Sequence, residues 1–290
     1  MREIVVISGK GGTGKTSLTA SFAYLEKENA VIADCDVDAA NMHLLLEADF
    51  ATQEDFFSGE EAFIDEQNCI NCGICESTCR FNAISFDGDK YVVDPISCEG
   101  CWYCSRVCPR ETIKMNTKKA GDFYISKTKV GSIMAHAKLG FGAENSGKLV
   151  AHVKNSAKKL ALENEKNFII VDGSPGIGCP VVSSLSGAHL VVLVTEATTS
   201  GLHDLKRVHQ VVKTFGLRAV CIINKYDLNE EVTSSIETFL EEEKIKLVGK
   251  IAYDEMFTKA LSEGKCIVQS DSSLSYEIKN SWELIKKEVI

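Results

Sequence analysis

A glycine-rich segment near the start of the chain has the residue types of a phosphate-binding loop. Residues 9–16 read Gly-Lys-Gly-Gly-Thr-Gly-Lys-Thr, which fits the pattern G-x-x-x-x-G-K-S/T, and they lie between a β-branched run and a helical apolar pattern. Such glycines let backbone N–H groups surround an anion, while the lysine neutralises its charge and the threonine hydroxyl can bind Mg²⁺. The motif therefore predicts a nucleotide site formed by Gly9, Lys10, Gly11, Gly12, Thr13, Gly14, Lys15, Thr16 and Ser17.

Eight of the twelve cysteines lie between residues 69 and 108, in two copies of the spacing C-x2-C-x2-C-x3-C. This spacing resembles that of bacterial ferredoxins, which bind [4Fe-4S] clusters, and Pro109 follows the second copy as in those proteins. In a two-cluster ferredoxin the fourth cysteine of each copy binds the cluster of the other copy. Zinc is the alternative, because paired C-x2-C units also form zinc ribbons, but zinc does not need this four-cysteine spacing. The resemblance implies one cluster on Cys69, Cys72, Cys75 and Cys108 and a second on Cys98, Cys101, Cys104 and Cys79.

Three further motifs follow the glycine-rich loop in chain order. One apolar run ends in Asp34-Cys35-Asp36-Val37-Asp38, a second leads from Phe168 through Asp172 to Gly176, and a third ends in Asn224-Lys225-Tyr226-Asp227. With the extra lysine at position 10, this set of motifs resembles the deviant Walker A ATPases of the MinD, ParA, Mrp and nitrogenase iron protein superfamily. The resemblance spans most of the chain outside the cysteine-rich segment.

The resemblance implies a catalytic role for Lys10, Lys15 and Asp36. In that superfamily the lysine at the position of Lys10 reaches the nucleotide across a homodimer that forms around ATP, and Lys15 neutralises phosphate charge. Asp36 matches the aspartate that positions the attacking water, and Asp38 is a competing candidate for this role. Capping of the following helix is the alternative role for Asp38 and for Asp34.

The same resemblance assigns residues to the magnesium ion, the γ-phosphate and the base. Thr16, Asp36 and Asp172 would hold Mg²⁺, and Gly176 would lie near the γ-phosphate, where movement of its loop senses hydrolysis. Asn224 would contact adenine, although a plain strand-end turn is a second interpretation of its motif. The implied cofactors are ATP, Mg²⁺ and the two [4Fe-4S] clusters.

The elements that must position these residues alternate between strands and helices. Residues 133–139 alternate as one strand, followed by a loop at 140–147 and a helix near 148–162. Helical patterns separate most of the other strands, so we expect an α/β fold with a doubly wound, mostly parallel P-loop NTPase sheet. The other runs have the length and continuous hydrophobicity of strands covered on both faces, at residues 2–8, 30–34, 168–172, 190–195 and 219–224.

The cysteine-rich segment interrupts this alternation. It has little helical periodicity, and it contains a predicted hairpin around Asp87-Gly88. We expect residues 63–114 to form a small inserted α+β domain like a bacterial ferredoxin. The P-loop ATPase domain would then comprise residues 1–62 and 115–290.

Composition and charge argue against several partners. The 290 residues are 44% hydrophobic, and a formal net charge of −9 gives no overall attraction to nucleic acid or anionic lipid. The first residues lack the features of a signal peptide, so we expect a cytoplasmic protein. The lysines at 154, 158 and 159 are candidates for DNA contact, and the amphipathic pattern at 278–289 is a candidate for membrane contact. The expected roles are a solvated helix face and docking on the core.

These features predict an ATP-binding and ATP-hydrolysing iron–sulfur protein. Because the insert lies between the two switch segments, we expect a nucleotide-switched homodimer that passes electrons through its clusters to a redox or metalloprotein partner. One alternative is an ATP-dependent iron–sulfur cluster carrier or scaffold, and another is a MinD- or ParA-like positioning ATPase. No nucleic acid or stable membrane association is expected.

Overall fold

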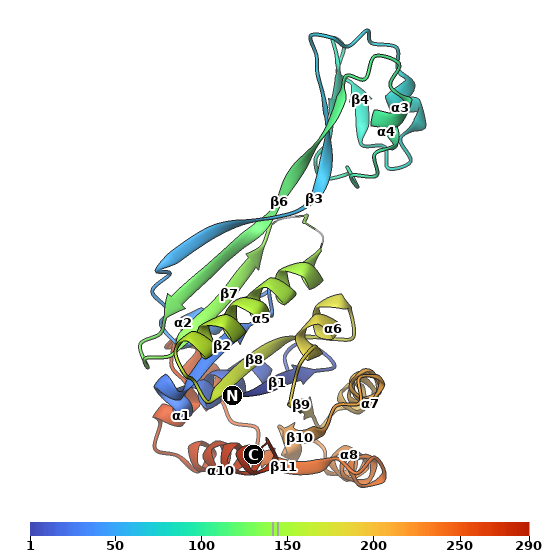
Figure 1. Ribbon diagram of the computed structural model, residues 1–290. Coiled ribbons are helices and arrows are strands. Elements are labelled where there is room, and N and C mark those ends of the chain that lie inside the picture. The colour runs from blue at the N-terminus through green and yellow to red at the C-terminus, as the bar shows by residue number, and fades with distance from the viewer. Residues whose placement is uncertain (141, 144, 290) are drawn as a thin grey trace. The chain divides into compact units, whose positions relative to one another are not determined.

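The computed structural model describes residues 1–140, 142–143 and 145–289 (Figure 1). The chain divides into two compact units. The larger unit comprises Met1–Glu54, Phe123–Lys138 and Ser146–Ile290, and the smaller unit comprises Asp55–Asp122 and Leu139–Asn145. Positions 141 and 144 of the predicted 140–147 loop, and position 290 of the predicted ATPase domain, lie outside the described residues. The domain limits drawn from the sequence, 63 and 114, stay predictions.

Most strands of one nine-stranded sheet belong to the larger unit. Within the described residues its strand order is β11-β10-β9-β1-β8-β2-β7-β6-β3, and each neighbouring pair from β11 to β7 is parallel. The predicted α/β fold with a mostly parallel sheet is therefore confirmed. The strands are β1 (Arg2–Ser8), β2 (Ala30–Asp34), β3 (Thr52–Ile64), β6 (Ile113–Lys127), β7 (Ile133–Leu139), β8 (Phe168–Pro175), β9 (Leu190–Glu196), β10 (Ala219–Asn224) and β11 (Lys246–Ile251).

Helices cover both faces of this sheet, as expected for a doubly wound fold. Figure 1 shows α5 to α8 on one face and α1 and α10 on the other. None of the helices in the described part of the chain is long and apolar enough to cross a membrane. The helices are α1 (Lys15–Glu26), α2 (Met42–Leu45), α5 (Ser146–Glu163), α6 (Cys179–Leu185), α7 (Thr199–Thr214), α8 (Glu230–Glu242), α9 (Met256–Ser262) and α10 (Ser273–Val289), with short 3-10 turns η1 (Lys27–Asn29), η2 (Tyr226–Leu228) and η3 (Ile267–Gln269).

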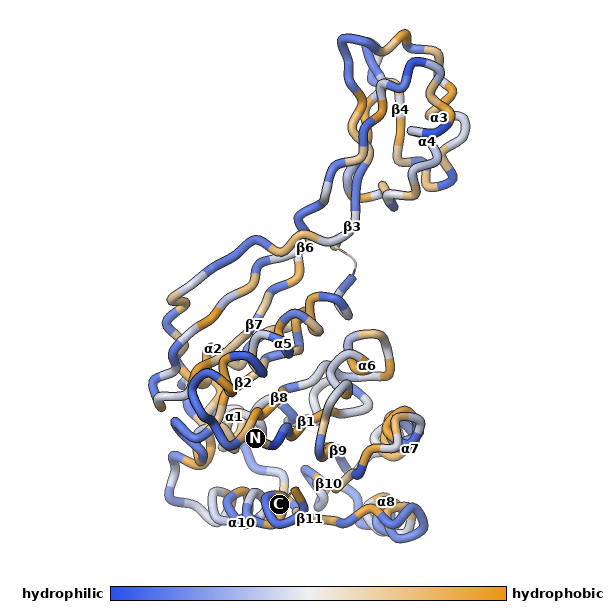
Figure 2. The backbone as a smooth tube through the Cα atoms, in the orientation of Figure 1, coloured by the Kyte–Doolittle hydropathy of each residue, from blue (hydrophilic) through white to orange (hydrophobic). Residues whose placement is uncertain are grey.

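The C-terminal helix α10 docks on the core. Ile278, Trp282 and Ile285 are each at most 1% exposed, and the Trp282 ring stacks on Phe22 of α1 with 4.9 Å between ring centroids. The apolar stripe that could have bound a membrane is therefore used for packing, as expected. Other surface helices follow the same rule: α7 and α8 each carry hydrophobic and hydrophilic stretches (Figure 2), because only one face of each is buried.

The expectation of a solvated lysine face on α5 is wrong for Lys154. Its side chain is 7% exposed, and its Nζ lies 2.6 Å from a carboxylate oxygen of Glu3 on β1. The same ammonium donates to the carbonyl of Ser186 at 2.6 Å and to that of Ser184. Lys154 is therefore part of the packing between α5, α6 and β1 and is not available to bind DNA.

The smaller unit contains two short helices and a hairpin. The helices are α3 (Ile74–Thr78) and α4 (Tyr103–Val107), and the antiparallel strands are β4 (Ile84–Phe86) and β5 (Tyr91–Val93). The turn between the strands begins at Asp87, whose N–H donates to the Lys90 carbonyl at 3.0 Å, so the hairpin predicted there is confirmed. The unit has a small core of its own, formed by Ala62, Ile64, Cys75, Ile84 and Ile113.

Candidate functional site

The glycine-rich loop joins β1 to α1 and lines a cavity of about 380 Å³. Gly12 and Gly14 have φ angles of 80° and 86°, a left-handed conformation that favours glycine. A Cβ atom at Gly9 would collide with the backbone of Asp204 in α7, so this position also requires glycine. The residues that line the cavity are Ser8, Gly11, Gly12, Thr13, Gly14, Lys15, Thr16, Ser17, Asp36, Asn41, Pro175, Asn224, Lys225, Tyr253, Asp254, Phe257, Thr258 and Leu261.

Three side chains of this loop and helix converge on Asp172 within β8. The Lys15 ammonium lies 2.9 Å from Asp172 Oδ1, and the hydroxyls of Thr16 and Thr19 donate to the same carboxylate at 2.7 and 2.9 Å. Asp172 is fully buried and Lys15 is 5% exposed. Burial opposes the charged form of Lys15, but attraction to Asp172 and Asp36 outweighs it and raises the pKa of Lys15. The lysine is therefore a fixed positive charge at the cavity.

Asp36 reaches the cavity and Asp38 does not line it. A carboxylate oxygen of Asp36 lies 3.4 Å from Lys15 Nζ, whereas the side chain of Asp38 is exposed to solvent. Burial raises the pKa of Asp36, and the nearby Lys15 limits the rise. Asp34, at the end of β2, accepts a hydrogen bond from the Asp36 N–H at 3.1 Å. Asp34 is itself fully buried, and burial raises its pKa. Its hydrogen bond supports Asp36, and the residue at the N-cap of the following helix is Asn41, so Asp34 is not a helix cap.

Lys10 points away from the lining of the cavity. Its Nζ lies 2.6 Å from Glu196 Oε1 and donates to the hydroxyls of Ser200 and Thr198 at 2.8 and 3.2 Å. The other carboxylate oxygen of Glu196 contacts Lys225 Nζ at 2.9 Å. Burial alone would raise the pKa of Glu196, but the hydrogen bonds from the two lysines lower it. Glu196 thus holds Lys10 within its own chain.

Asn224 and Gly176 each form a hydrogen bond to the chain in or next to the glycine-rich loop. Asn224 lines the cavity, is 1% exposed, and donates from Nδ2 to the Thr13 carbonyl at 2.8 Å. Gly176 donates its N–H to the Ser8 carbonyl at 2.9 Å with a φ of 91°, but it is the neighbouring Pro175 that lines the cavity. The buried hydroxyl of Thr13 has no hydrogen-bond partner among the described residues, which leaves it available to a bound ligand.

One wall of the cavity was missed by sequence reasoning. Tyr253 and Asp254 follow β11, and Phe257, Thr258 and Leu261 belong to the short helix α9. The signal that could have found them is positional: they follow a strand of a parallel sheet, and ligands bind outside the carboxyl ends of such strands.

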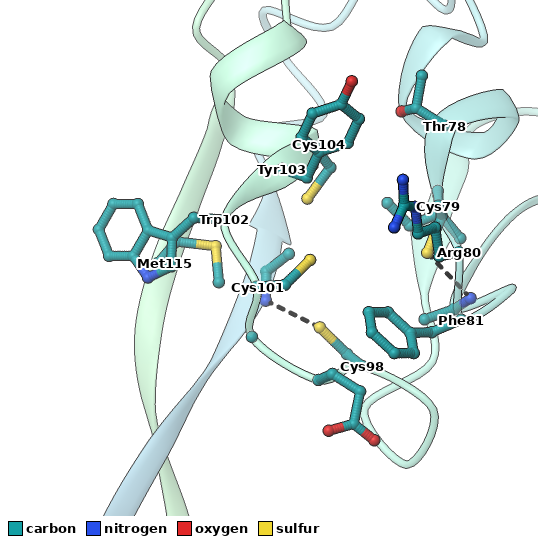
Figure 3. A pocket seen from close by; sticks show the side chains of 15 residues that line it. Thr78, Cys79, Arg80, Phe81, Cys98, Cys101, Trp102, Tyr103, Cys104 and Met115 are labelled. Atoms are coloured by element: carbon teal, nitrogen blue, oxygen red, sulfur yellow. Dashed lines mark hydrogen bonds between the residues drawn. The ribbon is translucent and has the colours of Figure 1, made fainter.

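The eight clustered cysteines line two cavities in the smaller unit. Each cavity collects three thiols from one copy of the repeat and one from the other copy, and Figure 3 shows Cys79 beside Arg80 across from Cys98, Cys101 and Cys104. Backbone N–H groups of Ala83 and Ala62 donate to the sulfurs of Cys79 and Cys98 at 3.4 and 3.5 Å. The first cavity is lined by Cys69, Cys72, Cys75 and Cys108, and the second, of about 390 Å³, by Cys79, Cys98, Cys101 and Cys104.

No metal centre follows from these cavities alone. All twelve cysteines lie in the described ranges, and none of them forms a disulfide. In the described part of the chain, no three side chains of His, Cys, Asp or Glu are grouped so that they could hold a metal ion. The predicted clusters, their ligands and an electron-transfer role are therefore not shown.

Comparison with known proteins identifies the family of the chain. The family model described as "CobQ/CobB/MinD/ParA nucleotide binding domain" matches residues 4–268. The chain belongs to this family. It is 34% identical to the uncharacterized protein MJ0578 of Methanocaldococcus jannaschii, over 98% of this chain and 96% of that protein. The predicted MinD/ParA superfamily is confirmed, and with it the general expectation of a nucleotide-binding ATPase.

Two solved structures show how far the likeness to the CobQ/CobB/MinD/ParA family reaches in three dimensions. The cell division ATPase MinD of Pyrococcus furiosus superposes with a TM-score of 0.60 at 19% identity, covering 99% of this chain and 98% of that one. The septum site-determining protein MinD of Pyrococcus horikoshii, complexed with Mg-ADP, superposes with a TM-score of 0.60 at 19% identity, covering 99% of this chain and 96% of that one. At this identity the likeness supports the shared fold.

Proposed function

We propose that the chain is an ATP-hydrolysing switch that binds ATP with Mg²⁺ and dimerises around it. The observation that carries the proposal is the convergence of Lys15, Thr16 and Asp36 with Asp172 beside the loop-lined cavity. Phosphoryl transfer needs positive charge at the phosphates, oxygen ligands for Mg²⁺, and an acceptor that orients the attacking water. These four side chains supply each of those groups.

Each residue would have a distinct task. Lys15 would move from Asp172 to the phosphate oxygens, and Thr16 with Asp172 would hold Mg²⁺, which neutralises charge on the phosphates. Asp36 would adjoin the magnesium shell and orient the attacking water, because it lines the cavity beside Lys15 while Asp38 is exposed. Gly176 would follow the γ-phosphate through the position of its loop.

The test compares Lys15→Ala with Lys158→Ala, which removes an exposed lysine of α5. We expect calorimetric titration with Mg-ATP to give a dissociation constant at least about 100-fold weaker for Lys15→Ala, because it loses charge-assisted hydrogen bonds to phosphate. Lys158→Ala should bind like the wild type. Equal affinity of the wild type and Lys15→Ala would refute the assignment of the site.

We also infer that the smaller unit would hold two [4Fe-4S] clusters. The support is the agreement between the two ligand sets drawn from ferredoxin spacing and the two sets of thiols that line separate cavities. In a [4Fe-4S] cluster each cysteine binds a different iron, so the four sulfurs are spaced more widely than the ligands of a single metal ion. The proposal therefore does not require a group of side chains that could hold one ion. The N–H groups aimed at Cys79 and Cys98 fit thiolate ligands, because such hydrogen bonds tune cluster potentials.

Anaerobic reconstitution with iron and sulfide tests this inference. We expect about eight iron atoms per chain, falling to about four in Cys79→Ser and in Cys108→Ser, because each substitution removes one ligand of a different cluster. Cys179→Ser, which removes an exposed thiol outside the repeat, should keep the full content. Binding of zinc with four thiolates per ion, and no iron after reconstitution, would overturn the cluster assignment.

The role of the switch has two candidates. The names of the compared structures, a cell division ATPase and a septum site-determining protein, favour a positioning ATPase, and the comparisons offer nothing for electron transfer. The two cysteine cavities are the specific observation that favours electron transfer to a redox or metalloprotein partner. We therefore propose the positioning role first and ATP-gated electron transfer as the second candidate.

Two measurements on the reconstituted protein separate these roles. A positioning ATPase should sediment with vesicles or DNA in Mg-ATP and not in Mg-ADP. ATP-gated electron transfer should instead appear as a shift of the cluster signals in an EPR-monitored redox titration on adding Mg-ATP, absent in Lys15→Ala. Cosedimentation without any shift would remove the second candidate, and the converse result would remove the first.

A further inference from the structure

The nucleotide cavity has an end built from two chain segments that follow neighbouring strands. One segment begins at Asn224, where β10 ends, and the other begins after Ile251, where β11 ends. The two strands pair in parallel, with Asn224 opposite Ile251 in the register, so both segments leave the sheet at the same edge. Asn224 and Lys225 line the cavity from the first segment, and Tyr253 and Asp254 line it from the second.

A single side chain ties the two segments together. A carboxylate oxygen of Asp227 accepts a hydrogen bond from the Tyr253 N–H at 2.6 Å. Asp227 is the last residue of the sequence Asn-Lys-x-Asp, in which related NTPases read a base, but here it does not line the cavity. Its carboxylate is directed to the backbone of the other segment.

The neighbours of Asp227 are fixed by other contacts. Asn224 is held to the phosphate-binding loop through the Thr13 carbonyl, and Lys225 is held by Glu196 and by the Gly12 carbonyl at 3.1 Å. The second segment has its own local bond, from the Met256 N–H to Asp254 at 2.8 Å, which fixes the start of α9. Among the hydrogen bonds and ion pairs of the described residues, the bond from the Tyr253 N–H to Asp227 is the one that joins this segment to the fixed side of the cavity.

We propose that Asp227 is a positioning residue for the nucleobase: it does not touch the base but holds Tyr253 and Asp254 where the base binds. The proposal rests on the proposed ATP site and adds how that site recognises its nucleotide. The base would be contacted by Asn224, the 253–254 segment and the apolar side chain of Phe257, and the phosphates by the glycine-rich loop. Loss of the tie should weaken nucleotide binding without changing the chemistry at Lys15.

The test uses the full chain with Asp227→Ala and Asp227→Asn. An asparagine oxygen can accept from the same N–H but carries no charge, so Asp227→Asn should weaken nucleotide binding less than Asp227→Ala does. In Asp227→Ala we expect the dissociation constant for Mg-ATP to rise about tenfold, the loss of one charge-assisted hydrogen bond, with kcat at saturating Mg-ATP within about twofold. Glu242→Ala, which removes an exposed carboxylate at the end of α8, is the control.

A second readout does not depend on nucleotide. In the absence of ATP, amide hydrogen exchange in residues 252–261 should be faster in Asp227→Ala than in the wild type, with a smaller increase in Asp227→Asn and no change in Glu242→Ala. Unchanged exchange and unchanged affinity in Asp227→Ala would overturn the proposal. Binding in Asp227→Asn as weak as in Asp227→Ala, together with tighter binding of Mg-GTP than of Mg-ATP by the wild type, would also overturn the proposal, because Asp227 would then contact guanine directly. If the wild type binds no nucleotide while exchange responds as expected, the ATP site fails and the tie itself stands.

Discussion

Releasing Lys10 from Glu196 should make the ATP-bound dimer easier to form. In the monomer, the Lys10 ammonium contacts the Glu196 carboxylate at 2.6 Å, with side chains 27% and 11% exposed. If Lys10 must leave this site to reach the nucleotide of a second subunit, dimerisation loses that charge-assisted contact. Glu196→Gln keeps an acceptor of the same shape but removes its charge, so the contact that has to be broken is weaker.

The magnitude follows from the strength of the contact. A hydrogen bond between charged partners contributes about 1.5–3 kcal/mol, against about 1 kcal/mol for a neutral acceptor. The difference is about 0.5–2 kcal/mol in each subunit. Because a homodimer releases Lys10 in both subunits, the total is about 1–4 kcal/mol, and the dimer dissociation constant should be at least about 5-fold lower in Glu196→Gln. Sedimentation velocity over a range of protein concentrations, with Mg²⁺ and a non-hydrolysable ATP analogue, measures this constant.

Two controls isolate the contribution of Lys10. Glu242→Gln, on the exposed end of α8, should leave the dimer constant unchanged. Lys225→Ala tests whether the effect arises from the other lysine that Glu196 holds, and it should not mimic Glu196→Gln. A dimer constant in Glu196→Gln that is equal to or weaker than that of the wild type would refute the idea that Glu196 restrains Lys10.

Three further predictions concern stability. Burial, with a smaller effect of His43, lowers the pKa of His136 to about 4, so the unfolded chain binds the proton more tightly and stability is lost as pH falls from about 6.5 toward 4. Between pH 7 and pH 5 the free energy of unfolding should fall by about 2 kcal/mol for this reason. In His136→Gln, urea unfolding at the two pH values should show a smaller fall. Lys154→Met should cost about 3–5 kcal/mol because it leaves Glu3 buried without its partner, and the double variant with Glu3→Gln should recover most of that loss in the same assay. Trp282→Ala should lower stability by about 3–5 kcal/mol in thermal unfolding, whereas a membrane-binding helix would keep its stability and lose vesicle binding.

The sequence was informative where the signal is local. The glycine-rich loop and the alternating strand Ile133–Leu139 were each predicted from adjacent residues and lie where expected. The strand predicted at residues 168–172 is also present, but it continues to Pro175. By contrast, no strand was predicted at Thr52–Ile64, because many of its side chains are exposed and give no apolar alternation. Helix limits differed by one or two residues, as at α5, which spans Ser146–Glu163 where residues 148–162 were expected.

Contacts between distant segments could not be predicted in the same way. Glu196 meets Lys10 across most of the chain, and nothing near either residue indicates the other. Lys154 reads as a surface lysine until Glu3 is placed beside it by the packing of α5 on the sheet. The Tyr253 segment has no motif, so only the parallel register of β10 and β11 brings it to the nucleotide cavity.

The packing of the cysteines bears on whether the clusters could be cargo. Cys75 belongs to the small core of its unit, and Cys69, Cys79, Cys98, Cys104 and Cys108 pack against that core. Each cavity also takes one thiol from the other copy of the repeat, so emptying one site would disturb the chain that forms the second. A cluster meant for delivery needs thiolates that exchange without loss of structure, and only Cys72 and Cys101 among the eight are exposed. This arrangement favours clusters that stay in place, and it therefore weighs against a carrier or scaffold and leaves positioning and electron transfer as the roles to be separated by experiment.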